Sequence, residues 1–409
     1  MKRKILVTII VALLLSGGNV SAAESMKTTP KTENLSVMCV QPNYQIHIKY
    51  KDELKNKRNV GLFERVKTTD KYGIHHRNKN KVIEINEDYY PLQWGIENVG
   101  QTLYQEGVAG IDANVKKAWT ITRGSERVLV GVLDSGIDIN NVDIKDNIYV
   151  NKREIAGNGR DDDRNGYIDD VNGWDFLNDD ASVFDSALED SHGTYVASII
   201  GAPLDDVGMV GVSPNVTIVP LKFMSSVDGG DTTDAIRAIE YAKKIGVKII
   251  VCSWNGSTYN EALKEVMKKS GILFVCASGN QGINIDATPM YPASYDLENI
   301  ISVGAIDNQG NVPVYSNYGK KAVDVLAPGD AILGQFPGNM YYATNGTSAA
   351  APFVAGEAAL IYSKNPRMRS GSVKRCIMKN VVKDSRYSSV KSGGRIDVYR
   401  AVRSAAHMR

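Results

Sequence analysis

Four residues spread along the chain have the types needed for nucleophilic hydrolysis: Asp134, His192, Asn280 and Ser348. A serine hydroxyl becomes an effective nucleophile when an imidazole removes its proton and a carboxylate holds that imidazole in the correct tautomer. Of the five histidines, three precede residue 80 and His407 stands near the end. Since a catalytic base must lie inside the folded body, His192 is the candidate.

The surroundings of the candidate acid and nucleophile favour these roles. Asp134 follows the apolar run 127–133, which predicts a buried strand whose end would hold a side chain rigidly. Ser348 precedes the small and apolar run 349–361, which is typical of a buried helix. A serine at such a helix start lies near free backbone N–H groups and the positive end of the dipole. Pro352 fits this helix in its first turn, where N–H groups have no helical partner.

Asn280 follows another predicted buried strand, 272–276, and its amide could donate a hydrogen bond to a tetrahedral oxyanion. Each of the four residues also has a purely structural interpretation. Asp134 and Asn280 could form turns, while His192 and Ser348 could cap helices.

The elements that must position these residues alternate along the chain. Apolar runs at 127–133, 216–220, 247–251 and 272–276 predict strands, and helical patterns follow at 233–246 and 262–267. Strands that are apolar on both faces and alternate with helices imply a parallel sheet covered on both sides. We therefore expect an α/β fold, a three-layer αβα sandwich. In such sheets functional groups gather beyond the carboxyl ends of the strands, where Asp134, Ser253 and Asn280 would lie.

The chain divides into three parts by composition. Residues 1–22 combine a basic start, the apolar run 5–15 and the small-residue end Val20-Ser21-Ala22, as in a signal peptide. The alternative is a membrane anchor, for which the run is short. Residues 23–87 form a polar leader and a small basic segment with strand-like alternation at 44–48 and 82–85. Residues 88–409 form the body.

The overall composition excludes some classes of function. The chain has 409 residues, of which 43% are hydrophobic and 23% charged, and its formal net charge is +2. So small a charge argues against nucleic-acid binding. No later stretch would hold the protein in a membrane once the signal is removed. The spacing of the four cysteines, Cys39, Cys252, Cys276 and Cys376, fits no zinc or redox motif, and we expect Cys252 and Cys276 to be buried free thiols.

Four ordered blocks, 132–137, 191–194, 277–280 and 345–348, resemble those of subtilisin-like serine peptidases (subtilases). The resemblance implies that Asp134 orients His192, that His192 takes the proton of Ser348, and that Asn280 binds the oxyanion. It covers the chain from about residue 89 onward and implies a subtilisin-like fold. One departure is Ala349, where the family usually has Met after the catalytic serine.

The same resemblance implies a substrate cleft. Substrate would contact Ser253, Trp254 and Asn255 on one side and Ser278 and Gly279 on the other. Asn255 stands where the family usually has a glycine that lets substrate approach, and we expect the Trp254 side chain to narrow the cleft. Met290 would fall near the floor of the first pocket, which indicates a preference for apolar or medium-sized residues.

Two calcium sites are expected. The loop 161–170 places oxygens at alternate positions around a glycine, like the first half of an EF-hand loop. Its ligands would be Asp161, Asp163, Asn165, the Tyr167 carbonyl, Asp169 and Asp170; the alternative is a solvated acidic loop. The second site is implied by the resemblance, at Asp143 and Asp205 with Gln93 beside them.

These expectations describe a secreted, extracellular serine endopeptidase made as a zymogen. It would cut protein or peptide substrates as a monomer, hold structural calcium, and be inhibited by its own propeptide within residues 23–87. The alternatives are a dedicated processing protease for one exported peptide precursor and a non-catalytic subtilase-fold binding protein. A lipase is disfavoured for two reasons. Ser348 does not stand in a Gly-x-Ser-x-Gly motif, and the candidate residues follow the order Asp, His, Ser along the chain rather than Ser, Asp, His.

Overall fold

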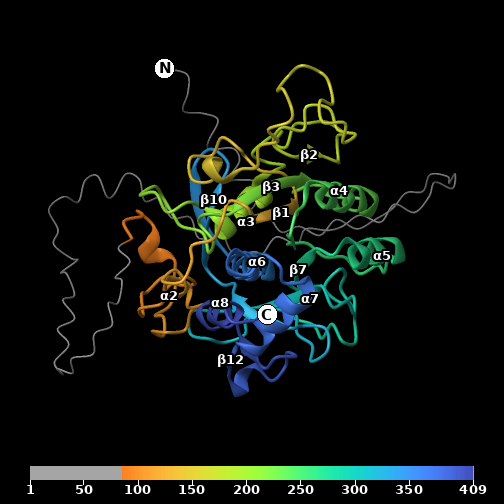
Figure 1. Ribbon diagram of the computed structural model, residues 1–409. Helices are drawn as coiled ribbons and strands as arrows, with labels where there is room; N and C mark the ends of the chain where they lie inside the picture. The colour runs from red at the N-terminus through yellow and green to blue at the C-terminus, as the bar shows by residue number, and fades with distance from the viewer. Residues whose placement is uncertain (1–84, 409) are drawn as a thin grey trace, which may run out of the picture. The chain divides into compact units, whose positions relative to one another are not determined.

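A computed structural model describes residues 85–408, and a nine-stranded sheet lies at the centre of this part of the chain (Figure 1). The strand order is β12-β13-β9-β8-β7-β6-β1-β3-β2, with parallel pairing throughout except between β12 and β13 at one edge. The strands are β1 (Leu129–Asp134), β2 (Trp174–Asp175), β3 (Thr217–Lys222), β6 (Ile249–Cys252), β7 (Leu273–Ala277), β8 (Ile300–Ile306), β9 (Val325–Pro328), β12 (Val382–Lys383) and β13 (Gly394–Arg395). Two separate hairpins are β4 (Met224–Ser225) with β5 (Gly229–Gly230) and β10 (Ile332–Phe336) with β11 (Met340–Thr344).

Helices cover both faces of the sheet. One face carries α2 (Val115–Ala118), α3 (Ser191–Gly201), α6 (Thr347–Lys364), α7 (Ser370–Lys379) and α8 (Val398–Ala405). The other face carries α4 (Thr232–Ile245) and α5 (Glu261–Ser270), drawn in green at one side of Figure 1. Short 3-10 helices are η1 (Tyr90–Leu92), η2 (Lys145–Asn147) and η3 (Ser385–Tyr387).

Two hydrophobic cores follow from the alternation of side chains along the strands. In β6, Ile249 and Val251 enter the core under α3 and α6, while Ile250 and Cys252 enter the core under α4 and α5. Successive side chains of a strand point to opposite faces, so strands that are apolar throughout serve both layers. The predicted three-layer α/β sandwich with a mostly parallel sheet is therefore confirmed.

The predicted element ends agree with the structure to within a few residues. Helix α4 begins where Asp231 accepts a hydrogen bond from the Thr233 backbone N–H, and it ends at Gly246, whose φ of 87° lies in the left-handed region.

Cys252 and Cys276 are buried free thiols, as expected. The predicted signal peptide, leader and strand-like segments before residue 85, together with Cys39, lie outside the described residues. No helix within residues 85–408 has the length and apolar character needed to cross a membrane.

The register of the sheet determines which loops meet. Strand β1 lies between β3 and β6, and Cys252 pairs with Cys276 across β6 and β7. Because these strands run parallel, the residues that follow them lie along one edge of the sheet. Asp134, Ser253 and Asn280 therefore come from neighbouring strand ends, as the sequence predicts.

The long helix α6 contains an ionisable group in an apolar setting. Glu357 is fully buried, and neither of its carboxylate oxygens has a hydrogen-bond partner within the described residues. Burial, with a smaller contribution from Asp397, raises the pKa of Glu357 well above its usual value of 4.5. The group is therefore protonated in the folded protein over a pH range where it ionises in the unfolded chain.

This difference predicts a pH-dependent effect of replacing Glu357 with glutamine. When folding raises the pKa of a carboxyl group, the group does not reduce the free energy of unfolding below its unfolded-state pKa. As pH rises from there toward the folded-state pKa, the free energy of unfolding falls. Glu357→Gln should match the wild type near pH 4 and then become more stable, by about 1.4 kcal/mol per pH unit across that window. Denaturant unfolding at several pH values measures the difference. The exposed Glu126→Gln is the control, and an equal gain in both variants would contradict the prediction.

Candidate active site

Asp134 and His192 are brought together from β1 and α3. The His192 Nδ1 atom lies 2.7 Å from the Asp134 Oδ1 atom, which also accepts a hydrogen bond of 2.8 Å from the Ser135 backbone N–H. Asp134 is fully buried, whereas His192 is partly exposed. A Cβ on Gly193 would collide with the backbone of Gly136, so only glycine allows α3 to come this close to the end of β1.

The carboxylate controls the basicity of the imidazole. Burial lowers the pKa of His192, but the charge of Asp134 and its hydrogen bond raise it, and the net result is a pKa above the usual 6.5. With Nδ1 bonded to the carboxylate, the other ring nitrogen is free to accept a proton. This is the arrangement that a general base requires.

Ser348 is the second residue of α6, and its side chain is partly exposed. The helix begins at Thr347, so Pro352 is its sixth residue, and the expectation that Pro352 lies in the first turn is wrong. A proline there cannot donate to the carbonyl four residues earlier, which is that of Ser348. That carbonyl instead accepts a hydrogen bond of 3.1 Å from the Ser253 hydroxyl. Ser253 thus compensates for the bond that Pro352 cannot make and ties the β6 end to the nucleophile.

The amide of Asn280 is held in one orientation. Its Oδ1 atom accepts hydrogen bonds from the Thr347 backbone N–H at 2.8 Å and from the Thr347 hydroxyl at 2.9 Å. Its Nδ2 atom, which would lie 3.2 Å from a Cβ on Gly346, donates no hydrogen bond within residues 85–408. The amide N–H₂ group therefore faces the helix start that carries Ser348 and is available to an oxygen there. Thr347, which makes this possible, was not singled out in the sequence.

No hydrogen bond joins the Ser348 hydroxyl to His192 within the described residues. Helices α3 and α6 nevertheless pack against each other, and both side chains are partly exposed. Catalytic hydrogen bonds are often long in the free protein and tighten when substrate binds.

The expected cleft residues divide into two kinds. The expectation that Trp254 narrows the cleft is wrong, because Trp254 is 3% exposed, its indole N–H donates to the Leu133 carbonyl at 2.9 Å, and its ring packs against Phe223. Ser278 is also buried, and its hydroxyl donates to the Asn317 carbonyl at 3.3 Å. The chain can therefore present only its backbone to a substrate at these two positions.

Asn255 and Gly279 lie close together, and both are buried. The Asn255 Nδ2 atom lies 3.3 Å from the position that a Cβ on Gly279 would occupy. Gly256 and Tyr291 form an antiparallel bridge beside them, with hydrogen bonds of 2.8 and 2.7 Å, and the neighbouring Met290 is 8% exposed. The structure thus brings the segments at 253–256, 278–280 and 290–291 together.

Residues 125–395 match the profile of the subtilase family. The chain belongs to this family. It is 34% identical over 251 residues to subtilisin DY of Bacillus licheniformis, covering 60% of this chain and 81% of that protein. It is 30% identical over 358 residues to the thermophilic serine proteinase of Bacillus sp. (strain AK1), covering 86% of this chain and 79% of that protein. The similarity to subtilisin-like protease 2 of Plasmodium falciparum (isolate 3D7), 35% over 261 residues, covers 61% of this chain and only 18% of that larger protein.

Solved structures share the subtilase fold. Fervidolysin from Fervidobacterium pennivorans, a keratinolytic enzyme related to subtilisin, superimposes with a TM-score of 0.62 at 23% identity, covering 78% of this chain and 46% of that one. A protease from Pseudoalteromonas arctica PAMC 21717 gives a TM-score of 0.61 at 23% identity, covering 78% of this chain and 99% of that one. At this identity the likeness concerns the fold alone.

The acidic loop of this subtilase gathers three carboxylates, of which the sequence indicated two. Ligand oxygens of Glu154, Asp161 and Asp163 all lie within 4.8 Å of one another. Glu154 is 9% exposed, and its Oε2 atom is buried without a hydrogen-bond partner in the described part of the chain. Three carboxylates so close together repel one another unless a cation lies between them, so this donor set fits calcium. Glu154 was missed because it lies outside the repeating pattern of the loop.

The other predicted ligands of this loop make hydrogen bonds within it. Asp169 accepts from the backbone N–H groups of Asn158 and Gly159, and the buried Asp170 accepts from the Tyr241 hydroxyl at 2.6 Å. The Asn165 Nδ2 atom donates to Asp170 at 2.9 Å. The Tyr167 ring packs edge-on against Tyr241, with 4.8 Å between ring centroids. These contacts fix the loop, but the carboxylates of Asp169 and Asp170 do not join the cluster of three.

Asp143 and Asp205 lie near a third carboxylate, Glu87. The Glu87 Oε1 atom accepts from the backbone N–H groups of Asp205 and Asp206, whereas its Oε2 atom and the Asp143 Oδ1 atom are buried without partners in the described structure. Burial, with smaller contributions from Asp205 and Glu87, raises the pKa of Asp143 to about 8, although hydrogen bonds from Met209 and Tyr341 oppose the rise. Among the described residues, however, these three carboxylates do not form a close cluster like that of Glu154, Asp161 and Asp163. Glu87 stands on the propeptide side of the predicted boundary at residue 88, yet it contacts the catalytic domain.

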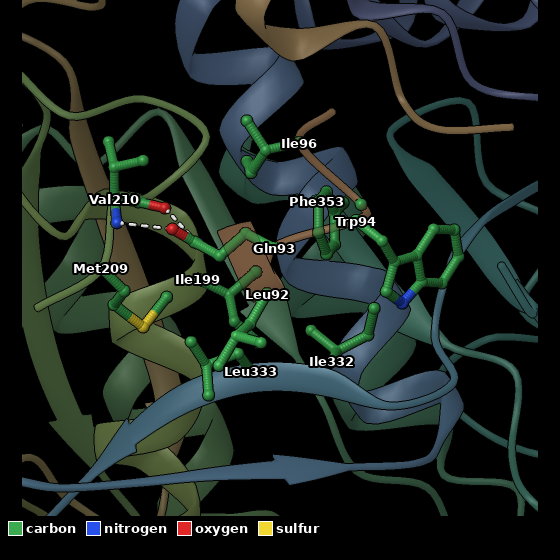
Figure 2. Close-up of a pocket in the computed structure, with 11 residues that line it drawn as sticks. Leu92, Gln93, Trp94, Ile96, Ile199, Met209, Val210, Ile332, Leu333 and Phe353 are labelled. Atoms are coloured by element: carbon green, nitrogen blue, oxygen red, sulfur yellow. Dashed lines mark hydrogen bonds between the residues drawn. The ribbon is translucent and has the colours of Figure 1, made fainter. Parts of the chain in front are cut away.

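Gln93 is engaged elsewhere. Figure 2 shows its amide bonded at both ends to the backbone of Val210, with Nε2 donating to the carbonyl at 2.7 Å and Oε1 accepting from the N–H at 3.0 Å. The rest of its surroundings are apolar, including Ile199 and Leu333. Gln93 therefore anchors the segment that follows Gly208.

The Asp134–His192 contact predicts the effect of replacing Asp134 with asparagine. Without the carboxylate, burial is the remaining influence, and the pKa of His192 should fall from above 6.5 to below it. NMR titration of the His192 imidazole measures this shift. Asp138→Asn, which removes a nearby carboxylate that contacts the Gly338 and Asn140 backbone instead, should leave the His192 titration unchanged. A His192 pKa that stays above 6.5 in Asp134→Asn would contradict the assignment.

Proposed function

We propose that this protein is a secreted serine endopeptidase, made as a zymogen, that hydrolyses peptide bonds through an acyl-enzyme. The observation that carries the proposal is the 2.7 Å contact between His192 and the buried Asp134. The helix that carries His192 packs against α6, which has Ser348 at its start. Membership of the subtilase family supports it. The signal-like pattern of residues 1–22 supports export.

The first half of the reaction forms an ester. The Ser348 oxygen attacks the substrate carbonyl carbon while its proton passes to the free nitrogen of His192, and Asp134 stabilises the imidazolium. His192 then gives this proton to the leaving amine as the carbon–nitrogen bond breaks. The acyl group remains on Ser348, and the amine product departs with the proton.

The second half restores the enzyme. His192 removes a proton from water as the water oxygen attacks the ester carbon, and the same proton returns to the Ser348 oxygen when the ester breaks. In both halves the carbonyl oxygen becomes an oxyanion, which Asn280 Nδ2 and the Ser348 backbone N–H stabilise. Because the Thr347 contacts orient the amide beforehand, little reorganisation accompanies the charge.

We also propose that the segment before Glu87 acts as an intramolecular inhibitor that the enzyme removes. Glu87 and Tyr89 are attached to the loop after α3, through the backbone N–H groups of Asp205 and Asp206 and through Gly208. Cleavage after Glu87 would separate these two contacts. We therefore expect the mature chain to begin at or before Glu87.

Calcium is proposed as a structural ion. Glu154, Asp161 and Asp163 would hold one ion, and Asp143, Glu87 and Asp205 a second. The ion supplies only positive charge to these buried or crowded carboxylates and takes no part in the reaction.

Replacing Ser348 with alanine tests the catalytic proposal. The full-length wild type should label with a fluorophosphonate and lose its propeptide, while Ser348→Ala should do neither and accumulate at full length. Asn280→Ala should still label but lose about 10²–10³ in kcat, the typical contribution of one oxyanion donor. Gel analysis and peptide hydrolysis give the readouts. The proposal fails if the wild type neither labels nor matures, or if Ser348→Ala matures normally.

Removing calcium tests the loop site. Saturating calcium at about 100 times its dissociation constant stabilises a protein by about 2.7 kcal/mol, so a chelator should lower the melting temperature by several degrees. Glu154→Gln and Asp163→Asn should reduce this calcium-dependent shift. The matched control is Asp162→Asn in the same loop, whose carboxylate bonds Ile155 and Asn158 instead. Equal shifts in all variants would argue against this site.

A further inference from the structure

We propose that this protein binds an anionic phospholipid surface through a cluster of exposed cations around α8. This contact surface, named the basic face, consists of Lys117, Lys364, Arg367, Arg369 and Arg403. It would hold the exported protein reversibly against lipid phosphate groups. The inference adds a second surface to the protein, and the binding does not require the proposed peptidase reaction.

Charge is divided unevenly along the described part of the chain. Residues 364–408 contain twelve lysines and arginines but only two acidic residues, Asp384 and Asp397. Both acids already pair with arginines two or three residues away, at 2.8 and 3.1 Å. Residues 85–363 contain nineteen lysines and arginines and thirty-seven acidic residues. The formal net charge of +2 for the whole chain therefore conceals a basic C-terminal part on an acidic body.

The segment between α6 and α7 is fixed beside the end of α8. The Asn365 Nδ2 atom donates to the Ala405 carbonyl at 3.3 Å and to the Met408 carbonyl at 2.8 Å. Helices α6, α7 and α8 also pack against one another, and Figure 1 shows them together with α2. The three exposed cations of the segment 364–369 therefore lie near the end of α8.

The other two cations of the basic face share one aromatic ring. The Lys117 Nζ atom lies 4.5 Å from the centroid of the Tyr399 ring, and the Arg403 guanidinium carbon lies 5.2 Å from the same centroid. Tyr399 belongs to α8, the helix that also accepts the hydrogen bonds from Asn365. All five cations are therefore gathered around one helix.

These cations have no acidic partner of their own. Lys116, the neighbour of Lys117, pairs with Glu97 at 2.8 Å, and Lys269 on α5 pairs with Glu265 at 3.0 Å. Within residues 85–408, no member of the basic face makes such an ion pair with a carboxylate. Their charges are therefore available to an anion from outside the protein.

Helix stability does not account for the two arginines that precede α7. The N-terminal end of a helix carries partial positive charge, which disfavours cations there, and the first turn of α7 has no acidic residue to offset Arg367 and Arg369. The same effect favours Lys364, which stands at the C-terminal end of α6. An anion at the basic face would relieve the unfavourable charge beside α7.

The composition of the basic face indicates a surface that bears phosphate groups. Three of its five cations are arginines, whose planar guanidinium groups bind phosphate oxygens through two hydrogen bonds at once. The cations come from α2, α8 and the segment that begins at the end of α6, so they suit many phosphates better than one small anion. Of the large apolar side chains in residues 364–408, Met408 alone is well exposed, and attachment would therefore be electrostatic.

Export and geometry favour a lipid surface as the source of the phosphate groups. The signal-like residues 1–22 would carry the chain across a membrane, whose outer surface it then meets first. Ser348 is the second and Lys364 the last of the 18 residues of α6, so about 24 Å of helix separates them. Lipid contact at this end of α6 would therefore leave the start of the helix, with Ser348, free to receive peptides.

Vesicle binding by the exported protein tests the inference. The wild type should sediment with vesicles that mix phosphatidylglycerol with phosphatidylcholine, but not with vesicles of phosphatidylcholine alone. Each basic residue at an anionic membrane contributes about fivefold in affinity, so Arg367→Gln combined with Arg369→Gln should weaken binding about tenfold or more. Lys117→Gln combined with Arg403→Gln should act alike. Raising the salt from about 0.1 M to about 1 M should abolish binding, because the screening length falls from about 10 to about 3 Å.

The matched control removes the same charge from another exposed pair. Lys268→Gln combined with Lys269→Gln on α5 should bind vesicles like the wild type. Melting temperatures check that the variants fold, and the second pair on the basic face keeps the test valid if the first pair misfolds. Ser348→Ala should also bind like the wild type, so vesicle binding and peptide hydrolysis can fail separately.

Four outcomes would overturn the inference. The wild type could show no preference for phosphatidylglycerol, or the α5 control could lose as much affinity as the basic-face variants. Binding to soluble polyphosphate but not to vesicles would show that the partner is not a membrane. Salt-sensitive self-association without lipid, abolished by the basic-face substitutions, would show that the acidic body of a second copy covers this face instead. None of these results would affect the proposed peptidase function, which labelling by a fluorophosphonate tests independently.

Discussion

The hydrogen bond between Asp134 and His192 depends on a buried charge cluster behind it. Lys222 of β3 is fully buried and pairs in register with Asp134, and its ammonium lies 3.2 Å from carboxylate oxygens of Asp175 and Asp190. A buried ammonium is destabilising unless it is paired. Asp190 immediately precedes α3, so the helix start cannot leave the end of β1 without separating these charges. The position of the imidazole is therefore fixed by electrostatics as well as by packing.

The nucleophile is positioned by a different means. Helix α6 is buried almost throughout, and Pro352 removes one of its internal hydrogen bonds at the carbonyl of Ser348. The hydroxyl of Ser253 donates a hydrogen bond to that carbonyl instead, and the Thr347 backbone N–H donates to Asn280 Oδ1. Thus the start of α6 is joined to the ends of both β6 and β7, and the reacting groups are supported by strand ends that the sheet register has already aligned.

Much of this could be predicted because it depends on local pattern. Alternation of apolar strands with helices gave the sheet and its layers, and the scarcity of histidines identified His192. The direction of Trp254 could not be predicted, since a residue just beyond a strand can face the core or the cleft, and only packing against Phe223 decides between them. Glu87 and Glu154 were missed for a related reason: their carboxylates meet the other acidic groups only through tertiary contacts. The place of Pro352 depended on the helix start, which sequence defines poorly.

The residues that carry out the reaction are more tightly constrained by the backbone than a neighbouring residue such as Asn255. The groups that move protons and stabilise charge stand on strand ends and helix starts, where backbone geometry leaves little freedom. Asn255, which follows β6, is not in a left-handed backbone conformation, and its Oδ1 atom has no hydrogen-bond partner within the described residues. The hydrogen bonds that hold Ser348, His192 and Asn280 involve no atom of the Asn255 side chain. Such a position can change without affecting the residues that position the reacting groups.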